Sequence, residues 1–195
     1  MKGLSEGVVA ATGELSDIEN DRESAIAYSR KVIRLTKAVI HGIHAGTPYQ
    51  ESLREMDDKM GELRSVCALS QVETSGPVQD AMSEYAEAKI LHAIMMGQEI
   101  PSHSDLGISA GAWILGLADV EGELRRAVMT RLMDGDLDGA KELFSEMEEI
   151  HTEIMMLDVP DAVLPIRRKQ DIARGIMDKT RSDITNASIM RYGRD

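Results

Sequence analysis

The chain has 195 residues, the size of one domain, and we expect a single helical domain over residues 1–195. Aromatic residues make up only 3% of the sequence, and 13 methionines join leucine, isoleucine and alanine as the apolar content, a mixture that favours helices over sheets. The net charge of −12 argues against a protein that coats nucleic acid nonspecifically, because phosphate binding depends on lysine and arginine.

Apolar residues recur at helical spacing in six segments, which we expect to be helices: about 15–44, 50–70, 75–96, 104–133, 136–155 and 166–191. Before residue 15 the pattern does not decide between an extension of the first helix and a frayed end. Pro77 suits the first turn of the third helix, where its missing N–H does no harm. Ser104 or Asp105 is the expected N-cap of the fourth.

We expect no segment to cross a membrane, since the longest nearly uncharged apolar run, 106–118, is shorter than the roughly 20 residues that a spanning helix needs. The N-terminus lacks the continuous apolar stretch of a secretory signal. Cys67 has no second cysteine with which to form an internal disulfide. Together these features predict a protein of the reducing cytoplasm.

Two of the expected helices carry paired carboxylates although they read as apolar on nearly every face. Glu84 and Glu87 are three residues apart and Asp119 and Glu123 are four apart, so each pair shares one helical face. Aspartate and glutamate are almost never buried without a partner. Four carboxylates gathered in an apolar bundle would repel one another and take up protons, unless a divalent cation neutralises them. The pattern therefore predicts a metal site.

The surroundings and the donor type support this hypothesis. Small residues beside the acids would let the helix backbones approach one another: Ala86, Ala88, Gly116, Ala118 and Gly122. An all-oxygen ligand set favours Mg²⁺, with Mn²⁺ also suitable, over zinc. The alternative that stays open is structural, with Glu84 paired to a basic residue of another helix and Glu87 at the edge of the bundle.

Two competing motifs fit less well. Residues 134–139 open like a calcium-binding EF-hand loop, but its twelfth position holds Ser145 in place of glutamate and a helical pattern runs through the segment. All-α nucleotide pyrophosphohydrolases also use Glu-x-x-Glu on one helix with acids on the next. Their second motif is typically Glu-x-x-Asp, which Asp119-x-x-x-Glu123 does not match.

Over residues 21–184 the chain resembles the translin superfamily, and the branch of translin-associated factor X more closely than translin itself. The resemblance rests on the order and spacing of several segments: Ser29–Ile33 followed by Ile43-His44, Glu84–Ala88, Gly116–Leu124, Gly135–Asp138, and Arg167–Lys169. The short sequence is most similar to an archaeal type of family member that acts without a eukaryotic partner.

The resemblance implies an all-α, translin-like bundle of about six to seven long helices that assembles into a hollow homo-oligomeric shell with RNA inside. The translin-associated factor X branch implies an Mg²⁺-dependent endoribonuclease for single-stranded RNA. Carried over by motif, its catalytic acids fall on Glu84, Glu87, Asp119 and Glu123, the four residues that the burial argument selects independently. Translin proper lacks most of these acids and binds RNA with little or no cleavage.

The sequence thus predicts a metal-assisted phosphodiester hydrolase in which one carboxylate, such as Glu123, orients the attacking water. The expected RNA-binding residues are basic and lie on the first and third helices: Arg30, Arg34, Lys37, Lys89 and His92. For these the alternative of a solvated face or an inter-helix salt bridge stays open. The remaining alternative function is a non-catalytic RNA-binding oligomer.

Overall fold

The computed structural model describes residues 3–69 and 76–192, and within them it contains helices and no strands. The helices are α1 (Leu4–Ala45), α2 (Gln50–Leu69), α3 (Gly76–Met95), α4 (His103–Leu106), α5 (Ala110–Met133), α6 (Leu137–Met155) and α7 (Arg167–Tyr192). The expected all-α bundle of six to seven helices is confirmed. The expected starts and ends at Ser70 and Ser75 lie outside the described residues.

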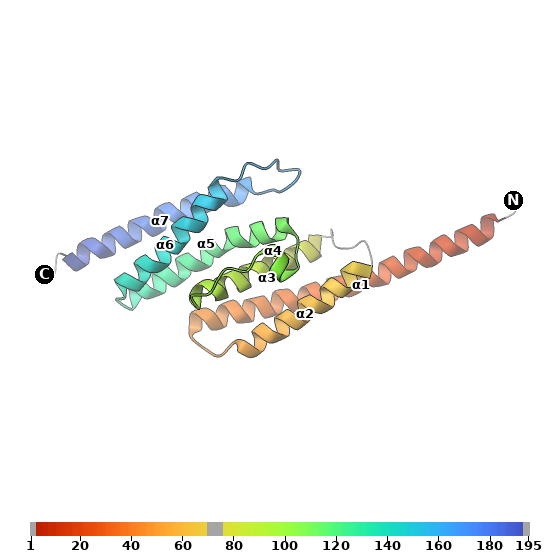
Figure 1. Ribbon diagram of the computed structural model, residues 1–195, viewed down its shortest axis with the longest axis horizontal. Helices are drawn as coiled ribbons and strands as arrows, with labels where there is room; N and C mark the ends of the chain where they lie inside the picture. The colour runs from red at the N-terminus through yellow and green to blue at the C-terminus, as the bar shows by residue number, and fades with distance from the viewer. Residues whose placement is uncertain (1–2, 70–75, 193–195) are drawn as a thin grey trace.

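The helices pack in a chain of neighbours, which Figure 1 shows as an elongated stack. α1 packs against α2 and α3, α3 packs against α5, and α5 packs against α6 and α7. The central α3–α5 pair therefore joins two halves of the bundle. The core of the bundle is aliphatic and rich in methionine, with Met56, Met60, Leu91, Leu124 and Met147 almost completely buried. In the described part of the chain, none of the helices has the length and apolar character that crossing a bilayer requires.

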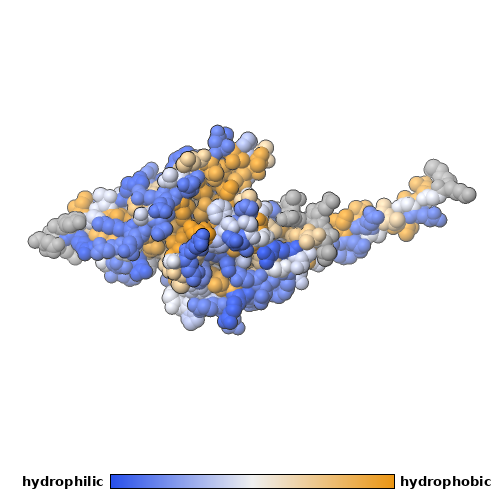
Figure 2. Space-filling view, in the orientation of Figure 1, coloured by the Kyte–Doolittle hydropathy of each residue, from blue (hydrophilic) through white to orange (hydrophobic). Residues whose placement is uncertain are grey.

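The first helix extends eleven residues beyond the part that the sequence pattern defines. α1 begins at Leu4 and is 42 residues long, so the segment before Leu15 is helical. Its buried positions begin only at Ala25 and continue through Ser29 and Val32 to the end that packs on α2 and α3. Residues 4–20 are exposed throughout and project away from the bundle (Figures 1 and 2).

The expected fourth helix is wrong at its start, because two helices occupy the segment. Ser102, and neither Ser104 nor Asp105, caps the short α4, and it shares a reciprocal capping box with Asp105. Gly107 then adopts a left-handed conformation with φ 61°, which an L-residue with a side chain rarely takes. Ser109 caps α5 by accepting a hydrogen bond from the Ala112 N–H.

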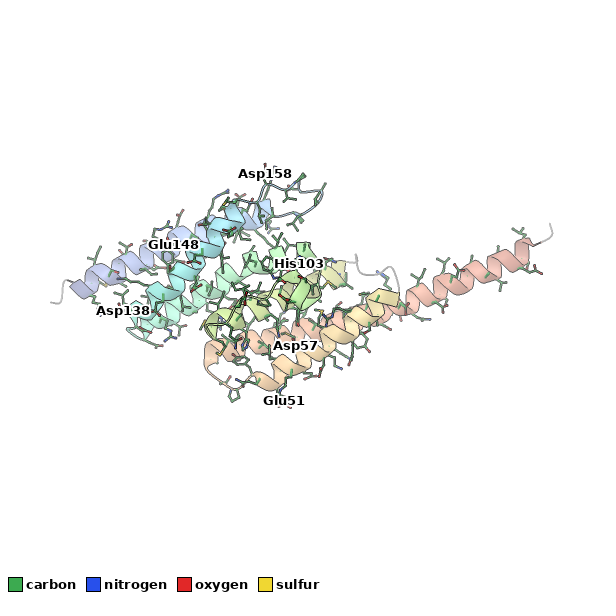
Figure 3. The ribbon with its side chains drawn as sticks, viewed as in Figure 1. Glu51, Asp57, His103, Asp138, Glu148 and Asp158 are labelled. Carbon is green, nitrogen blue, oxygen red and sulfur yellow. The ribbon has the colours of Figure 1, made fainter. Side chains whose placement is uncertain are left out.

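The segment 134–139 is an ordinary turn between helices. Gly135 has a positive φ of 78°, and Asp136 caps α6 by accepting a hydrogen bond from the Gly139 N–H. Asp136 also pairs with Arg131, while Asp138, labelled in Figure 3, pairs with Arg191 of α7. The carboxylates of Asp136 and Asp138 thus serve helix capping and ion pairs.

Candidate metal and RNA site

A close approach of α3 and α5 places the two acidic pairs beside each other. Gly116 of α5 lies so near α3 that a Cβ there would come within 2.5 Å of the Ser83 carbonyl oxygen and 3.0 Å of the Glu87 backbone nitrogen. Asp119 follows Gly116 by one helical turn, so its side chain emerges next to α3 at the level of Glu87. The expectation that small residues let these two backbones approach holds at Gly116.

The four carboxylates act on one another electrostatically. The pKa of Glu87 is raised to about 8, mainly because burial disfavours its ionised form and then because Asp119, Glu84 and Glu123 carry like charge around it. Lys169 opposes this shift. No hydrogen bond or ion pair joins the Glu87 carboxyl group to any other residue in the described ranges. The Glu87 carboxyl group is therefore available to a proton or a cation.

The other three acids have partners, which come from helices far apart in the sequence. The Thr36 hydroxyl of α1 donates to Glu84 at 3.3 Å, and Nε2 of His44 lies 2.6 Å from Oε2 of Glu123. Lys169 of α7 forms an ion pair with Asp119. Four helices, α1, α3, α5 and α7, thus converge on the acids, and the site depends on the whole bundle.

His44 favours the ionised form of Glu123. Its hydrogen bond is the largest influence on this carboxyl group and lowers the pKa of Glu123 despite partial burial. Arg126, one turn further along α5, lies 3.7 Å from the same oxygen and adds to the effect. Because an ionised carboxylate only accepts hydrogen bonds, Nε2 of His44 carries the shared proton. The site therefore contains one carboxyl group that favours ionisation, Glu123, beside one that resists it, Glu87.

The acids fit a divalent cation in donor chemistry and in charge, since all donors are oxygens and Glu87 forms no direct ion pair within the described ranges. Among the residues that the structure describes, however, no three His, Cys, Asp or Glu side chains are arranged around one point in the way that would hold a metal ion. Two of the carboxylates contact other helices in this arrangement, since Asp119 pairs with Lys169 of α7 and Glu123 with His44 of α1. Binding all four donors would require these two side chains to leave their partners.

A cavity of about 570 Å³ opens beside Asp119, between α5 and α7. Ala118 and Gly122 form its α5 wall, and Arg168 and Lys169 contribute positive charge from α7. Because the side chain of Arg168 is exposed, its charge is accessible from solvent. The negative site is thus bordered by cations that suit the phosphates of a nucleic acid.

The expected RNA-binding residues fall into two groups. Arg30, Arg34 and Lys37 lie at spacings of four and three residues on an exposed face of α1, and none of them forms an ion pair within the described ranges. By their helical positions they lie next to the side of α1 that His44 directs toward the acids. They form a solvent-accessible cationic stripe that borders the site.

The structure does not bring Lys89 and His92 to the acids. Lys89 pairs at 2.9 Å with Asp57 of α2, which Figure 3 labels, and its ammonium group lies over the Tyr85 ring. Nδ1 of His92 lies 3.0 Å from the Tyr49 hydroxyl group, and burial lowers the pKa of the imidazole. Both residues lie on the α2 side of α3. The contacts support the structural alternative for these two residues, and their RNA contact stays a prediction.

Three residues of the site were not assigned to it from the sequence: Thr36, His44 and Lys169. His44 and Lys169 belong to segments that carry the family resemblance, and this was the available signal. Nothing in the local pattern shows that His44 contacts Glu123, which is 79 positions away in the sequence. The same holds for Lys169 and Asp119, which are 50 positions apart.

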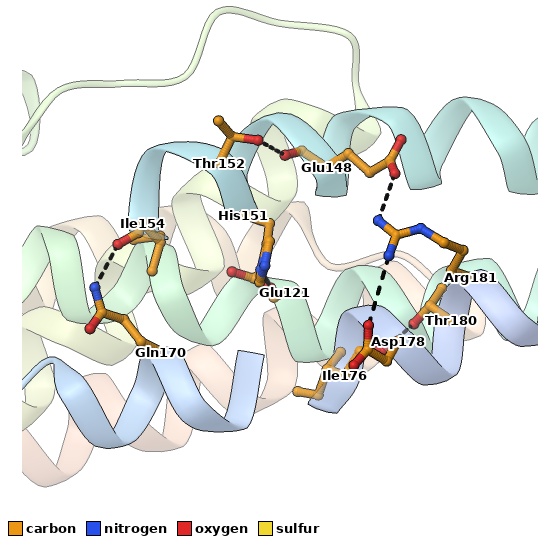
Figure 4. A network of polar contacts seen from close by, with 10 residues as sticks. All are labelled: Glu121, Glu148, His151, Thr152, Ile154, Gln170, Ile176, Asp178, Thr180 and Arg181. Carbon is orange, nitrogen blue, oxygen red and sulfur yellow. Dashed lines mark hydrogen bonds and ion pairs between the residues drawn. The ribbon is translucent and has the colours of Figure 1, made fainter. Parts of the chain in front are cut away.

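Glu121 was not singled out from the sequence, in which it lies between Asp119 and Glu123, and it is not part of the four-acid site. It points to the opposite side of α5 and is completely buried against α6. One oxygen lies 3.1 Å from Nδ1 of His151, and the other has no hydrogen-bond partner in the described structure (Figure 4). Burial raises the pKa of Glu121, and His151 opposes the shift. The contact links α5 and α6, outside the four-acid site.

Known proteins resemble the chain in sequence and in fold. No model of a known protein family matches it. An uncharacterized protein of Methanocaldococcus jannaschii is 34% identical over 174 residues, which are 87% of this chain and 78% of that protein. The match is extensive enough to show that the two proteins are members of one family.

Solved structures extend the comparison. The crystal structure of AfC3PO is 28% identical, covers 95% of this chain and 98% of its own, and has a TM-score of 0.79. The structure of AfC3PO in complex with duplex RNA is 27% identical, with the same coverage and a TM-score of 0.77. Apo-NeC3PO is 20% identical with a TM-score of 0.82, covers 92% of this chain and 96% of its own, and supports the fold alone. The chain therefore belongs to the family of the Methanocaldococcus jannaschii protein and, with these structural relatives, to the translin superfamily.

Proposed function

We propose that this protein is a metal-dependent endoribonuclease of the translin-associated factor X type, which hydrolyses phosphodiester bonds at the four-acid site. The observation that supports this proposal most is the convergence of Glu84, Glu87, Asp119 and Glu123 from α3 and α5, with no direct ion pair to Glu87 among the described residues. The RNA part of the proposal is supported by the likeness to AfC3PO, which has been solved with duplex RNA. We further propose single-stranded RNA as the preferred substrate, self-association into a homo-oligomer, and a location in the cytoplasm.

In this proposal the four acids would hold Mg²⁺ or Mn²⁺, which would supply Lewis-acid activation of the phosphate. Glu123 is suited to orient the attacking water as a base, because its hydrogen bond with His44 favours the ionised form and fixes the direction of the carboxylate. When RNA binds, Lys169 exchanges Asp119 for a phosphate oxygen, and Arg168 in the same cavity contacts the neighbouring phosphate. The cationic stripe on α1 positions the strand.

The direct test is cleavage of a labelled RNA by a Glu84→Ala plus Glu87→Ala variant in Mg²⁺ or Mn²⁺. We expect wild-type protein to cut and the variant to be inactive while still folded, because the variant loses the α3 half of the ligand set. The matched control is Glu146→Ala plus Glu149→Ala, which removes two carboxylates at the same three-residue spacing from the exposed face of α6. This control should cut at the wild-type rate. A single-stranded RNA and its duplex, assayed side by side, test the strand preference.

RNA affinity distinguishes the two groups of basic residues. Replacement of Arg34 and Lys37 by glutamine should weaken RNA binding and reduce the dependence of log affinity on log salt by roughly 0.7–0.9 for each lost phosphate contact. Lys89→Gln removes a cation that already pairs with Asp57 and should leave affinity and salt slope unchanged. The measurement is a titration of RNA by fluorescence anisotropy at several salt concentrations. Equal losses in both variants would contradict the assignment of the α1 stripe.

One observation favours a second candidate, an RNA-binding protein that does not cut. Lys169 and His44 already occupy two of the four acids, as they would in a site with a purely structural role. This candidate predicts RNA binding without cleavage in either metal. It also predicts that divalent metal leaves the melting temperature unchanged, whereas the nuclease proposal predicts that metal raises it.

A further inference from the structure

The exposed segment of α1, residues 4–20, which we call the arm, carries an apolar stripe that none of the described helices covers. Leu4, Val8, Ala11, Leu15 and Ile18 follow one another at alternating spacings of four and three residues, and we call them the arm stripe. Their large members are well exposed: Leu4 54%, Val8 57%, Leu15 66% and Ile18 49%. Figures 1 and 2 show this segment standing clear of the bundle with apolar side chains along it.

The arm stripe continues the surface that buries the rest of α1. After Arg22 the same alternation reaches Ala25, Ser29 and Val32, which are buried. Those positions pack on other helices of the chain, whereas the arm extends past the helices that would cover it. An isolated helix of this length is marginal in water, and its stability depends on covering its apolar face. The continuity indicates that the arm stripe also packs against a helix, one that another molecule supplies.

The spacing identifies the kind of helix that fits. Apolar residues at alternating four- and three-residue steps form the seam of a coiled coil, in which each side chain inserts between residues of a facing helix with the same repeat. The arm itself has this repeat. We therefore propose that the arm is an interaction surface for a second copy of the chain, and that two arms pair antiparallel about a two-fold axis.

The antiparallel register matches the stripe to itself. Val8 then lies opposite the partner's Ile18, and Ala11 lies opposite the partner's Leu15, so that each layer joins a smaller side chain to a larger one. At each end the aliphatic stem of Arg22 packs on the partner's Leu4 while its guanidinium group reaches solvent. The overlap covers Leu4 to Arg22, which is about 27 Å of helix.

Charge favours the antiparallel over the parallel pairing. In a parallel pair the flanking Glu14 of each arm would face the partner's Glu19, which gives two repulsive contacts. In the antiparallel pair Glu14 faces only its own counterpart, at the centre. Glu19 and Asp21 of each arm then lie beside the N-terminus of the partner's helix, where the helix dipole favours negative charge.

A matched pair of variants tests whether the arm stripe is an interface. Leu15→Asp places a charge within the seam, whereas Ser16→Asp places the same charge on the same arm but on the side away from it. By sedimentation velocity we expect wild-type protein and Ser16→Asp to associate alike, and Leu15→Asp to need at least about a tenfold higher concentration for the same average mass. A wild-type chain of single-chain mass, or equal masses for both variants, would overturn the proposal. The melting temperature of the bundle serves as the folding control.

A cross-linking experiment tests the direction of pairing. With a short bis-maleimide, Glu14→Cys at the centre of an antiparallel pair should form covalent dimers, whereas Leu4→Cys should not, since the two copies of that residue are about 27 Å apart. A parallel pair would cross-link at both positions. Wild-type protein controls for Cys67, which is buried. Efficient cross-linking of Leu4→Cys, or none of Glu14→Cys, would overturn the antiparallel arrangement. This inference rests on the proposed self-association: a wild-type chain of single-chain mass would overturn both, whereas an oligomer that Leu15→Asp leaves unchanged would overturn the arm pairing alone. Neither readout requires catalysis, so the nuclease activity is tested separately.

Discussion

A Glu87→Gln variant is expected to be more stable than the wild-type chain at pH 8 in the absence of divalent metal, and to have lost RNA cleavage. The pKa of Glu87 is raised from its ordinary value of 4.5 to about 8 in the folded protein, so folding favours the protonated form. Glutamine imitates that neutral form at every pH. The variant removes the repulsion that the ionised carboxylate suffers from Asp119, Glu84 and Glu123, but it also removes a proposed metal ligand.

The pH dependence has a definite sign. Between about pH 4.5 and 8 the folded state binds more protons at Glu87 than the unfolded state does, so this residue makes wild-type stability fall as the pH rises through that window. The difference between Glu87→Gln and wild type should therefore be small at pH 5 and grow to the order of 2–4 kcal/mol at pH 8. Urea unfolding at several pH values measures it.

Metal and a second variant provide the controls. Millimolar Mg²⁺ should raise the melting temperature of wild type more than that of Glu87→Gln. The metal binds only the folded state, and the variant has lost one of the side chains proposed to coordinate it. Glu123→Gln should also stop cleavage, but it should lower stability at neutral pH, because the ionised Glu123 accepts a hydrogen bond from His44. If both variants changed stability in the same direction, the contrast between these two carboxyl groups would be wrong.

Gly116→Ala is expected to destabilise the bundle by about 1–3 kcal/mol, the usual effect of adding a methyl group to a filled space. The new Cβ would lie 2.5 Å from the Ser83 carbonyl oxygen and 2.7 Å from the Ala86 Cβ, so α3 and α5 must separate. The separation would move Asp119 and Glu123 relative to Glu84 and Glu87. Cleavage should then fall by on the order of 10²-fold, since small displacements of catalytic groups have effects of that size.

Gly122→Ala is the matched control, because it makes the same substitution six residues further along α5, where nothing lies within 4 Å of the new Cβ. There the better helix propensity of alanine should stabilise the chain by about 0.5–1 kcal/mol. Urea unfolding of the two variants under identical conditions gives the comparison. A Gly116→Ala variant as stable as Gly122→Ala would show that the close approach does not determine the spacing of the two acidic pairs.

Much of the helical architecture follows from local sequence, with one instructive exception at the start of the fourth expected helix. Apolar periodicity locates long helices because one face must be buried wherever the chain folds. This periodicity does not distinguish one helix from two when the helical backbone breaks but the apolar spacing continues, as happens at Gly107 between α4 and α5. There the left-handed backbone of Gly107 and the capping hydroxyl group of Ser109 decide the break, and neither alters the apolar period.

For the candidate site, the sequence by itself predicted which acids to consider, because carboxylates on otherwise apolar helices need compensation wherever those helices pack. Only the tertiary structure decided what compensates each one, since the partners come from other helices. Lys169 and His44 reach two of the acids from α7 and α1, whereas Lys89, which is near Glu87 in the sequence, turns toward Asp57 on α2. Spacing within a helix reports which side chains share a face, but the packing of helices determines which faces meet.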